Sequence, residues 1–75
     1  MNTLNDFMAL IYEELGLSLT ANDTTINLSL LPGWDSVHAL QLLTALERKT
    51  GRRISMPDAL EAPDLQHIYA LAVGQ

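Results

Sequence analysis

The sequence predicts a small all-α fold: a four-helix bundle with three main helices, a short third helix and a long loop between the first two. Apolar residues recur at three- and four-residue intervals in several segments, as they do along one face of an α-helix. Residues that cap helices stand before these segments. Hydrophobic residues make up 48% of the chain, enough for one helical core. We therefore expect residues 1–75 to form a single domain and a complete gene product.

The first helix is expected over about residues 3–15. Thr3 and Asp6 fit a capping box at its start, and Gly16 stands where a helix of this length ends. Its predicted buried stripe consists of Leu4, Met8, Ile11 and Leu15.

Residues 17–35 carry no helical period. Ile26, Leu28 and Leu30 alternate with polar residues, as in a strand. A single strand would have no pairing partner in this chain. We therefore predict an ordered loop whose apolar side chains cover one end of the bundle.

The second helix is expected over about residues 36–50. When the side chains of this segment are projected around a helix at about 100° per residue, four apolar residues fall on one side. They form the predicted core face: Ala39, Leu42, Leu43 and Leu46. Val37 falls nearly opposite that face and Leu40 lies on its flank, on the side of Ser36. These two apolar residues beside Ser36 indicate a small docking surface.

The last two helices are predicted from their caps. Ser55 precedes a short helix at about residues 56–61, which Pro63 ends. Asp64 caps the final helix, and Gly74 ends it. The expected buried stripe of that helix is Leu65, Ile68, Tyr69 and Ala72.

The charge distribution disfavours nucleic-acid binding. The formal net charge is −5, and residues 1–47 contain no lysine or arginine. Such a surface repels phosphate backbones and favours basic protein surfaces. All four cations lie between residues 48 and 53: Arg48, Lys49, Arg52 and Arg53. Cations complement the negative end of a helix, which is the preferred interpretation here; a role in partner binding stays open.

No apolar run is long enough to span a membrane, and the start of the chain lacks the basic and apolar regions of a signal peptide. The absence of cysteine excludes disulfides and thiolate metal sites. We expect a cytoplasmic monomer that binds neither membrane nor nucleic acid.

Ser36 is the strongest candidate for a functional residue. It follows Asp35 at the start of the second predicted helix, directly after a Pro-Gly turn. Serine and aspartate are ordinary helix-capping residues, so the pair alone is weak evidence for function. A helix N-terminus also favours an attached anion such as a phosphodiester.

A catalytic role for Ser36 lacks its partners. A nucleophilic serine needs a base within hydrogen-bond reach that a third group orients. His38 is two positions on and faces another side of the helix, and His67 is distant in sequence. Two histidines without cysteine are too few for a zinc site, and we expect both to be surface residues. We therefore expect no catalytic residue and no metal.

Residues 31–37, Leu-Pro-Gly-Trp-Asp-Ser-Val, resemble the Gly-x-Asp-Ser-(Leu/Ile/Val) motif of acyl and peptidyl carrier proteins. The resemblance covers nearly the whole chain and implies the small acyl-carrier-like helical fold. It implies that a magnesium-dependent phosphopantetheinyl transferase moves 4′-phosphopantetheine from coenzyme A to Ser36, with Asp35 as the preceding acid. It also implies that Val37 and Leu40 contact partner enzymes. Trp34 is either a core plug or an interface anchor; its place next to Ser36 on a turn favours partial exposure, and we predict that it too contacts partners.

The resemblance further implies that the arm holds acyl or aminoacyl groups as thioesters, loaded by a ligase and used by downstream biosynthetic enzymes. Fatty-acid carriers have an acidic second helix, whereas this chain has His38, Gln41 and Arg48 there. Residues 36–42 and 61–65 are similar to peptidyl carrier domains of nonribosomal synthesis. A stand-alone carrier of a specialised pathway is the preferred interpretation, and a fatty-acid-type pathway stays open. The alternative is an acidic helical interaction module that is never modified.

Overall fold

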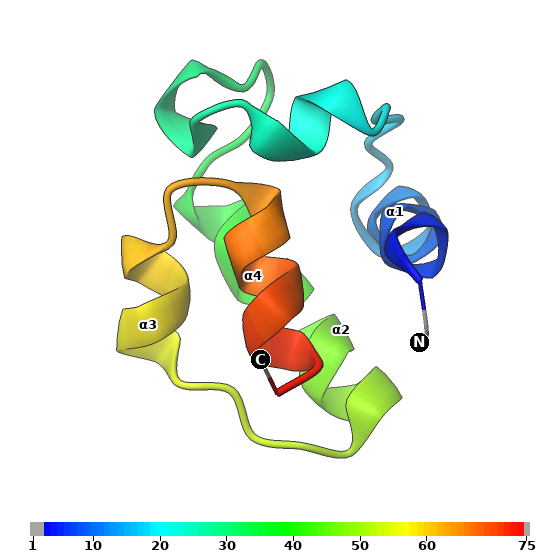
Figure 1. Cartoon of the computed structure of the whole chain (residues 1–75), viewed down its shortest axis with the longest axis vertical. Helices are drawn as coiled ribbons and strands as arrows, with labels where there is room; N and C mark the ends of the chain where they lie inside the picture. The colour runs from blue at the N-terminus through cyan, green and yellow to red at the C-terminus, as the bar shows by residue number, and fades with distance from the viewer. Residues whose placement is uncertain (1–2, 75) are drawn as a thin grey trace.

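The computed structural model describes residues 3–74, and helices are the regular elements of that range (Figure 1). Four α-helices and two short 3-10 helices follow one another along the chain. They are α1 (Leu4–Leu15), η1 (Asn22–Thr25), η2 (Leu28–Leu30), α2 (Ser36–Thr50), α3 (Met56–Glu61) and α4 (Leu65–Ala72). The all-α prediction is confirmed, and the α-helices match the predicted ranges within one or two residues.

A side chain caps the start of every α-helix in the described range. In each case its oxygen accepts a hydrogen bond from the backbone N–H three residues further on, which would otherwise lack a partner. The capping residues are Thr3, Asp35, Ser55 and Asp64. The two longest helices end at Gly16 and Gly51, whose positive φ angles of 73° and 69° suit glycine.

The apolar face of α2 forms the centre of the core. Its Leu42 and Leu46 side chains are 1% and 0% exposed. The helix packs against α1, α3 and α4; in Figure 1 it lies behind α4, with α3 and α1 on either side. On α1, the Phe7 ring lies 5.3 Å from the Tyr69 ring of α4, centroid to centroid, and so joins the two outer helices. The core face predicted for α2 is confirmed for its three leucines, while Ala39 is only half-buried.

The buried face of α1 differs from the predicted stripe. Phe7, Leu10 and Ile11 are buried, whereas Met8 is only half-buried. The stripe was placed too far to one side because spacing alone does not show where the neighbouring helices lie. Here Tyr69 of α4 contacts the side of α1 that carries Phe7.

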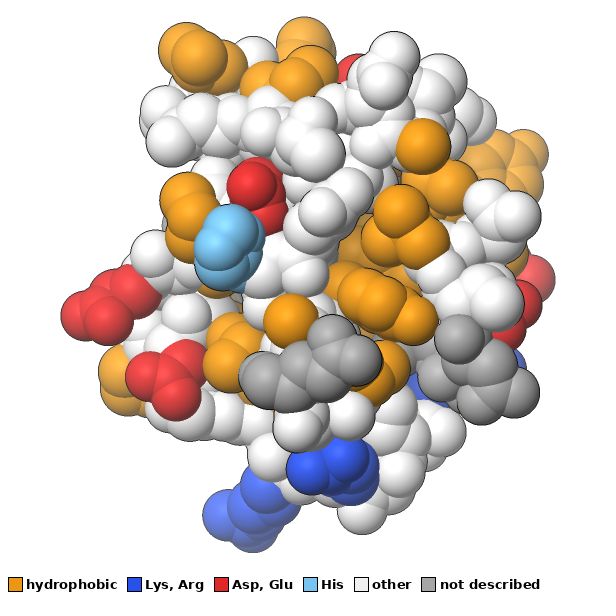
Figure 2. Space-filling model, in the orientation of Figure 1, with side chains coloured by type: hydrophobic (Ala, Val, Ile, Leu, Met, Phe, Trp, Pro, Cys, Tyr) orange, Lys and Arg blue, Asp and Glu red, His pale blue; other side chains and the backbone are white. Residues whose placement is uncertain are grey.

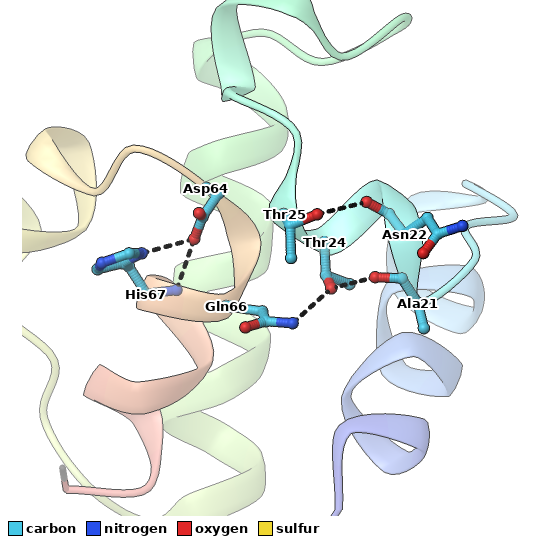
Figure 3. Close-up of polar contacts among 7 residues, drawn as sticks. All are labelled: Ala21, Asn22, Thr24, Thr25, Asp64, Gln66 and His67. Carbon is cyan, nitrogen blue, oxygen red and sulfur yellow. Dashed lines mark hydrogen bonds and ion pairs between the residues drawn. The ribbon is translucent and has the colours of Figure 1, made fainter.

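The long loop is ordered around a buried threonine. Thr24 is 0% exposed; its Oγ1 donates to the carbonyl of Ala21 and accepts a 3.2 Å hydrogen bond from Gln66 Nε2 on α4 (Figure 3). In a second contact, the Leu28 N–H donates a 2.9 Å hydrogen bond to the Pro63 carbonyl. These contacts hold the loop against the start of α4.

The prediction that Leu30 covers the bundle is wrong. Leu30 is 75% exposed, and Leu31 is buried instead at 5% exposure. The alternating pattern assumed an extended chain, but η2 is a 3-10 turn with about three residues per turn. Leu28 and Leu31 therefore face the same side.

Replacement of Leu46 by alanine is expected to lower the free energy of unfolding by about 2–5 kcal/mol, because it leaves a cavity beneath α2. Leu40→Ala, on the same helix but 50% exposed, should cost less than about 1 kcal/mol. Urea denaturation followed by circular dichroism measures both. Equal losses for the two variants would contradict the assigned faces of α2.

Candidate functional site

Ser36 is exposed at the first position of α2. Within residues 3–74 its hydroxyl makes no hydrogen bond, so the oxygen is not committed to holding the fold. Asp35 performs the capping instead, because its side chain accepts from the His38 N–H. The serine is therefore accessible to a second protein without any opening of the helix.

A tight turn places Ser36 relative to the core. The Trp34 N–H donates to the Leu31 carbonyl at 3.2 Å, closing a turn with Pro32 and Gly33 at its centre. Gly33 has a φ of 79°, the value that a type II turn requires at its third position. Because Leu31 is buried, the turn is anchored in the core, and α2 starts at a fixed place on the surface.

Asp35, His38 and Trp34 form a small cluster beside the serine. Asp35 Oδ1 lies 3.0 Å from the backbone nitrogen of His38 and 2.9 Å from its Nδ1. The Trp34 and His38 rings are stacked, with centroids 6.0 Å apart and 26° between their planes. The hydrogen bond from the His38 backbone, aided by its side chain, lowers the pKa of Asp35 below its usual value. A carboxylate is thus kept charged next to Ser36.

The same pattern occurs at the start of α4. Asp64 Oδ1 accepts from the His67 N–H and lies 2.6 Å from His67 Nδ1 (Figure 3). Burial raises the pKa of Asp64, but the two contacts with His67 outweigh it, and the pKa is lowered. Each Asp-x-x-His segment is therefore a helix cap with an added side-chain contact. No group of three metal-ligating side chains occurs within residues 3–74.

The partnership of His38 was missed from the sequence. His38 was interpreted as a surface histidine; instead it is half-buried between Asp35 and Trp34. The Asp-x-x-His spacing was a signal for it, since capping brings residues three apart together. The half-buried state of Trp34 agrees with the partial exposure that its place in the turn indicated.

A groove of about 380 Å³ opens beside Ser36, between η2, the start of α2 and the α3–α4 connection. Apolar side chains line much of it, including Leu28, Trp34, Ala39 and Leu60, and Ser36 and Asp35 lie among its lining. An exposed hydroxyl for a phosphodiester, a helix N-terminus that favours its charge and an adjoining groove suit a long, flexible arm. The residues present fit a phosphopantetheine group.

Exposed apolar side chains surround the candidate site. Val37 is 58% and Leu40 50% exposed, as predicted from the helical projection. Leu60 of α3 is 58% exposed and also lines the groove. It was not predicted, because a helix as short as α3 gives no reliable period. Together the three residues place apolar surface on α2 and α3.

A family model described as a phosphopantetheine attachment site matches residues 5–72. The chain belongs to this family. Such domains carry covalently attached 4′-phosphopantetheine, receive it from phosphopantetheinyl transferases and interact with biosynthetic enzymes. They are generally non-catalytic. No curated protein and no solved structure matches the chain.

Among residues 3–74, every helix is too short or too polar to cross a membrane.

The Asp35 carboxyl group is expected to titrate below about 3.9, the usual midpoint for aspartate. Because its pKa is lowered in the folded state, the cap stabilises the fold above pH 4 and loses that effect as pH falls through the folded pKa. NMR of the side-chain carboxyl carbon measures the midpoint. His38→Ala should raise it part of the way, since the backbone contact remains, whereas His67→Ala should not move it. A midpoint at or above 3.9 would contradict the cap geometry.

Proposed function

We propose that the chain is a carrier protein whose 4′-phosphopantetheine arm is attached to Ser36. The supporting observation is an exposed serine hydroxyl at the start of α2, free of hydrogen bonds within residues 3–74, in a chain of the phosphopantetheine attachment family. We take the carrier to be one domain over residues 1–75, acting as a monomer in the cytoplasm.

In the proposed reaction, Ser36 is the acceptor. Its Oγ forms the bond to the phosphorus of the phosphopantetheine group of coenzyme A, while the adenosine bisphosphate portion leaves. The transferase takes up the hydroxyl proton, so the carrier needs no base. The N-terminal end of α2 stabilises the attached phosphodiester. Asp35 keeps the first turn of the helix intact by capping it.

The thiol of the attached arm supplies the thioester on which acyl or aminoacyl cargo travels. We propose a specialised biosynthetic pathway of polyketide or nonribosomal-peptide type, with fatty-acid synthesis as the second choice. The support is the surface of α2: His38, Gln41 and Arg48 stand where an acidic recognition surface would need carboxylates. A ligase that loads the arm and the enzymes that consume its cargo are the proposed partners.

An unmodified interaction module is the competing function. The exposure of Val37, Leu40 and Leu60 fits a protein that docks on a partner without carrying anything. Both functions use the same surface. Only modification of the serine separates them.

Incubation with coenzyme A, magnesium and a promiscuous transferase is expected to add one phosphopantetheine mass to the protein. Ser36→Ala should abolish the gain because it removes the acceptor oxygen. Ser29→Ala is the matched control: Ser29 lines the same groove, but its hydroxyl is bound to Asn27 Oδ1 at 2.7 Å. Intact-mass spectrometry measures the mass of the natural chain and of the two variants. An unchanged mass for the natural chain would favour the interaction module.

Val37→Asp is expected to slow modification by the transferase at least about tenfold, since it puts a charge into an apolar contact beside the serine. The helix content should not change, because Val37 is 58% exposed. Tyr12→Asp is the control, an equal charge on the outer face of α1 at a residue 60% exposed.

The rate from intact-mass time courses and the circular dichroism spectrum are measured together. Unfolding of the Val37 variant would mean that the side chain is part of the core. Equal slowing by both variants would show a general charge effect rather than a docking surface.

A further inference from the structure

Three cations at the far end of α2 have no partner within the described chain. Arg48 is engaged, since its Nη2 lies 3.1 Å from Glu14 Oε2 on α1. Within residues 3–74, the side chains of Lys49, Arg52 and Arg53 make no ion pair or hydrogen bond. We call these three residues the basic pole. Figure 2 shows lysine and arginine side chains gathered at the lower end of the molecule.

Two of the three residues, Arg52 and Arg53, line an open hollow of about 520 Å³ together with Glu47 and Gly51. The one carboxylate there is partly committed, because Glu47 Oε2 accepts a 2.9 Å hydrogen bond from the Ile54 N–H. The Arg52 guanidinium lies so close to Gly74 that a Cβ there would come within 2.5 Å of it. Contact with the end of the chain thus limits where Arg52 can point.

The negative end of α2 does not account for the whole pole. Cations stabilise a helix within its last turn, which suits Arg48 and Lys49. Arg52 and Arg53 come after the C-cap, where Gly51 already closes the helix by donating to the Glu47 carbonyl. The side chains of Arg52 and Arg53 are both exposed. Arg52 packs against Gly74, but that contact does not use its charge, and no capping role explains either residue.

The basic pole and Ser36 lie at opposite ends of one helix. A helix of 15 residues is roughly 22 Å long, so a protein bound at one end leaves the other accessible. A carrier that is held at the pole can still present Ser36 to a different enzyme.

We propose that the basic pole binds a short acidic segment of a partner protein and thereby keeps the carrier near the enzymes that use it. This inference adds a second contact to the proposed carrier function. The chain as a whole is acidic, since nine acids against four cations give a net charge of −5. An extended polyanion such as RNA, or an anionic membrane, would also meet the acids of α1, for example Glu13 and Glu14. Lys49 lies beside both of these acids, but the hollow lined by Arg52 and Arg53 contains Glu47 as its one carboxylate. A short acidic segment can stay on these two arginines, so it fits the charge distribution best.

The test uses the full chain and a fluorescein-labelled peptide of about five glutamate residues, roughly 17 Å when extended, with a glutamine version as the neutral probe. Fluorescence anisotropy should show binding of the glutamate peptide that weakens as salt rises. Arg52→Gln with Arg53→Gln should raise Kd about fivefold or more. Asn5→Asp with Ser18→Asp changes the net charge equally at exposed positions elsewhere and should change Kd less than about twofold.

Three results would overturn the proposal. The first is equal binding of the glutamine peptide, and the second is equal weakening by the two double variants. The third is tighter binding to a 20-nucleotide RNA or to phosphatidylserine vesicles than to the peptide. Ser36→Ala should bind the peptide normally. A failure of pantetheinylation with normal peptide binding would therefore reject the carrier function alone, and the reverse would reject the basic pole alone.

Discussion

Burial of the apolar face of α2 is the constraint on which the molecule depends. Leu42 and Leu46 are enclosed by the other three α-helices, so the axis and rotation of α2 are fixed. The opposite side of the same helix must then face solvent, with Val37 and Leu40 exposed. Ser36 is accessible for a different reason: it is the first residue of α2, at the end of the helix where the surface turn joins it. The leucine core fixes the helix, and the turn places its first residue at the surface.

Much of this could be predicted from the sequence because the signals are local. Helix bounds follow from caps: Thr3, Ser55 and Asp64 each act on an amide three residues away, whatever the rest of the chain does. The accessibility of Val37 was also predictable, since a helix with a strong leucine face leaves its other side outside. The turn before Ser36 was also predictable, because a proline followed by a glycine supplies the backbone angles that such a turn requires. Each of these inferences concerns neighbours within one or two turns.

Several of the features that were missed depend on contacts between distant segments. Phe7 is buried because Tyr69, far along the chain, lies against it. Thr24 is buried because Gln66 reaches it from α4. Leu31 is buried and Leu30 is exposed because the loop forms a 3-10 turn rather than an extended segment. The hydrogen bond from the Leu28 N–H to the Pro63 carbonyl helps to hold that turn in place. No spacing rule contains that information.

Trp34 is the single tryptophan of the chain, stacked on His38 and lining the groove beside Ser36. Its indole emission therefore originates at one known place, without interference from another indole. Trp34 is therefore an intrinsic fluorescent probe of the groove, where the proposed phosphopantetheine arm or its cargo would displace water from the indole. Changes of spectrum or quenching there can be followed in real time on unlabelled material.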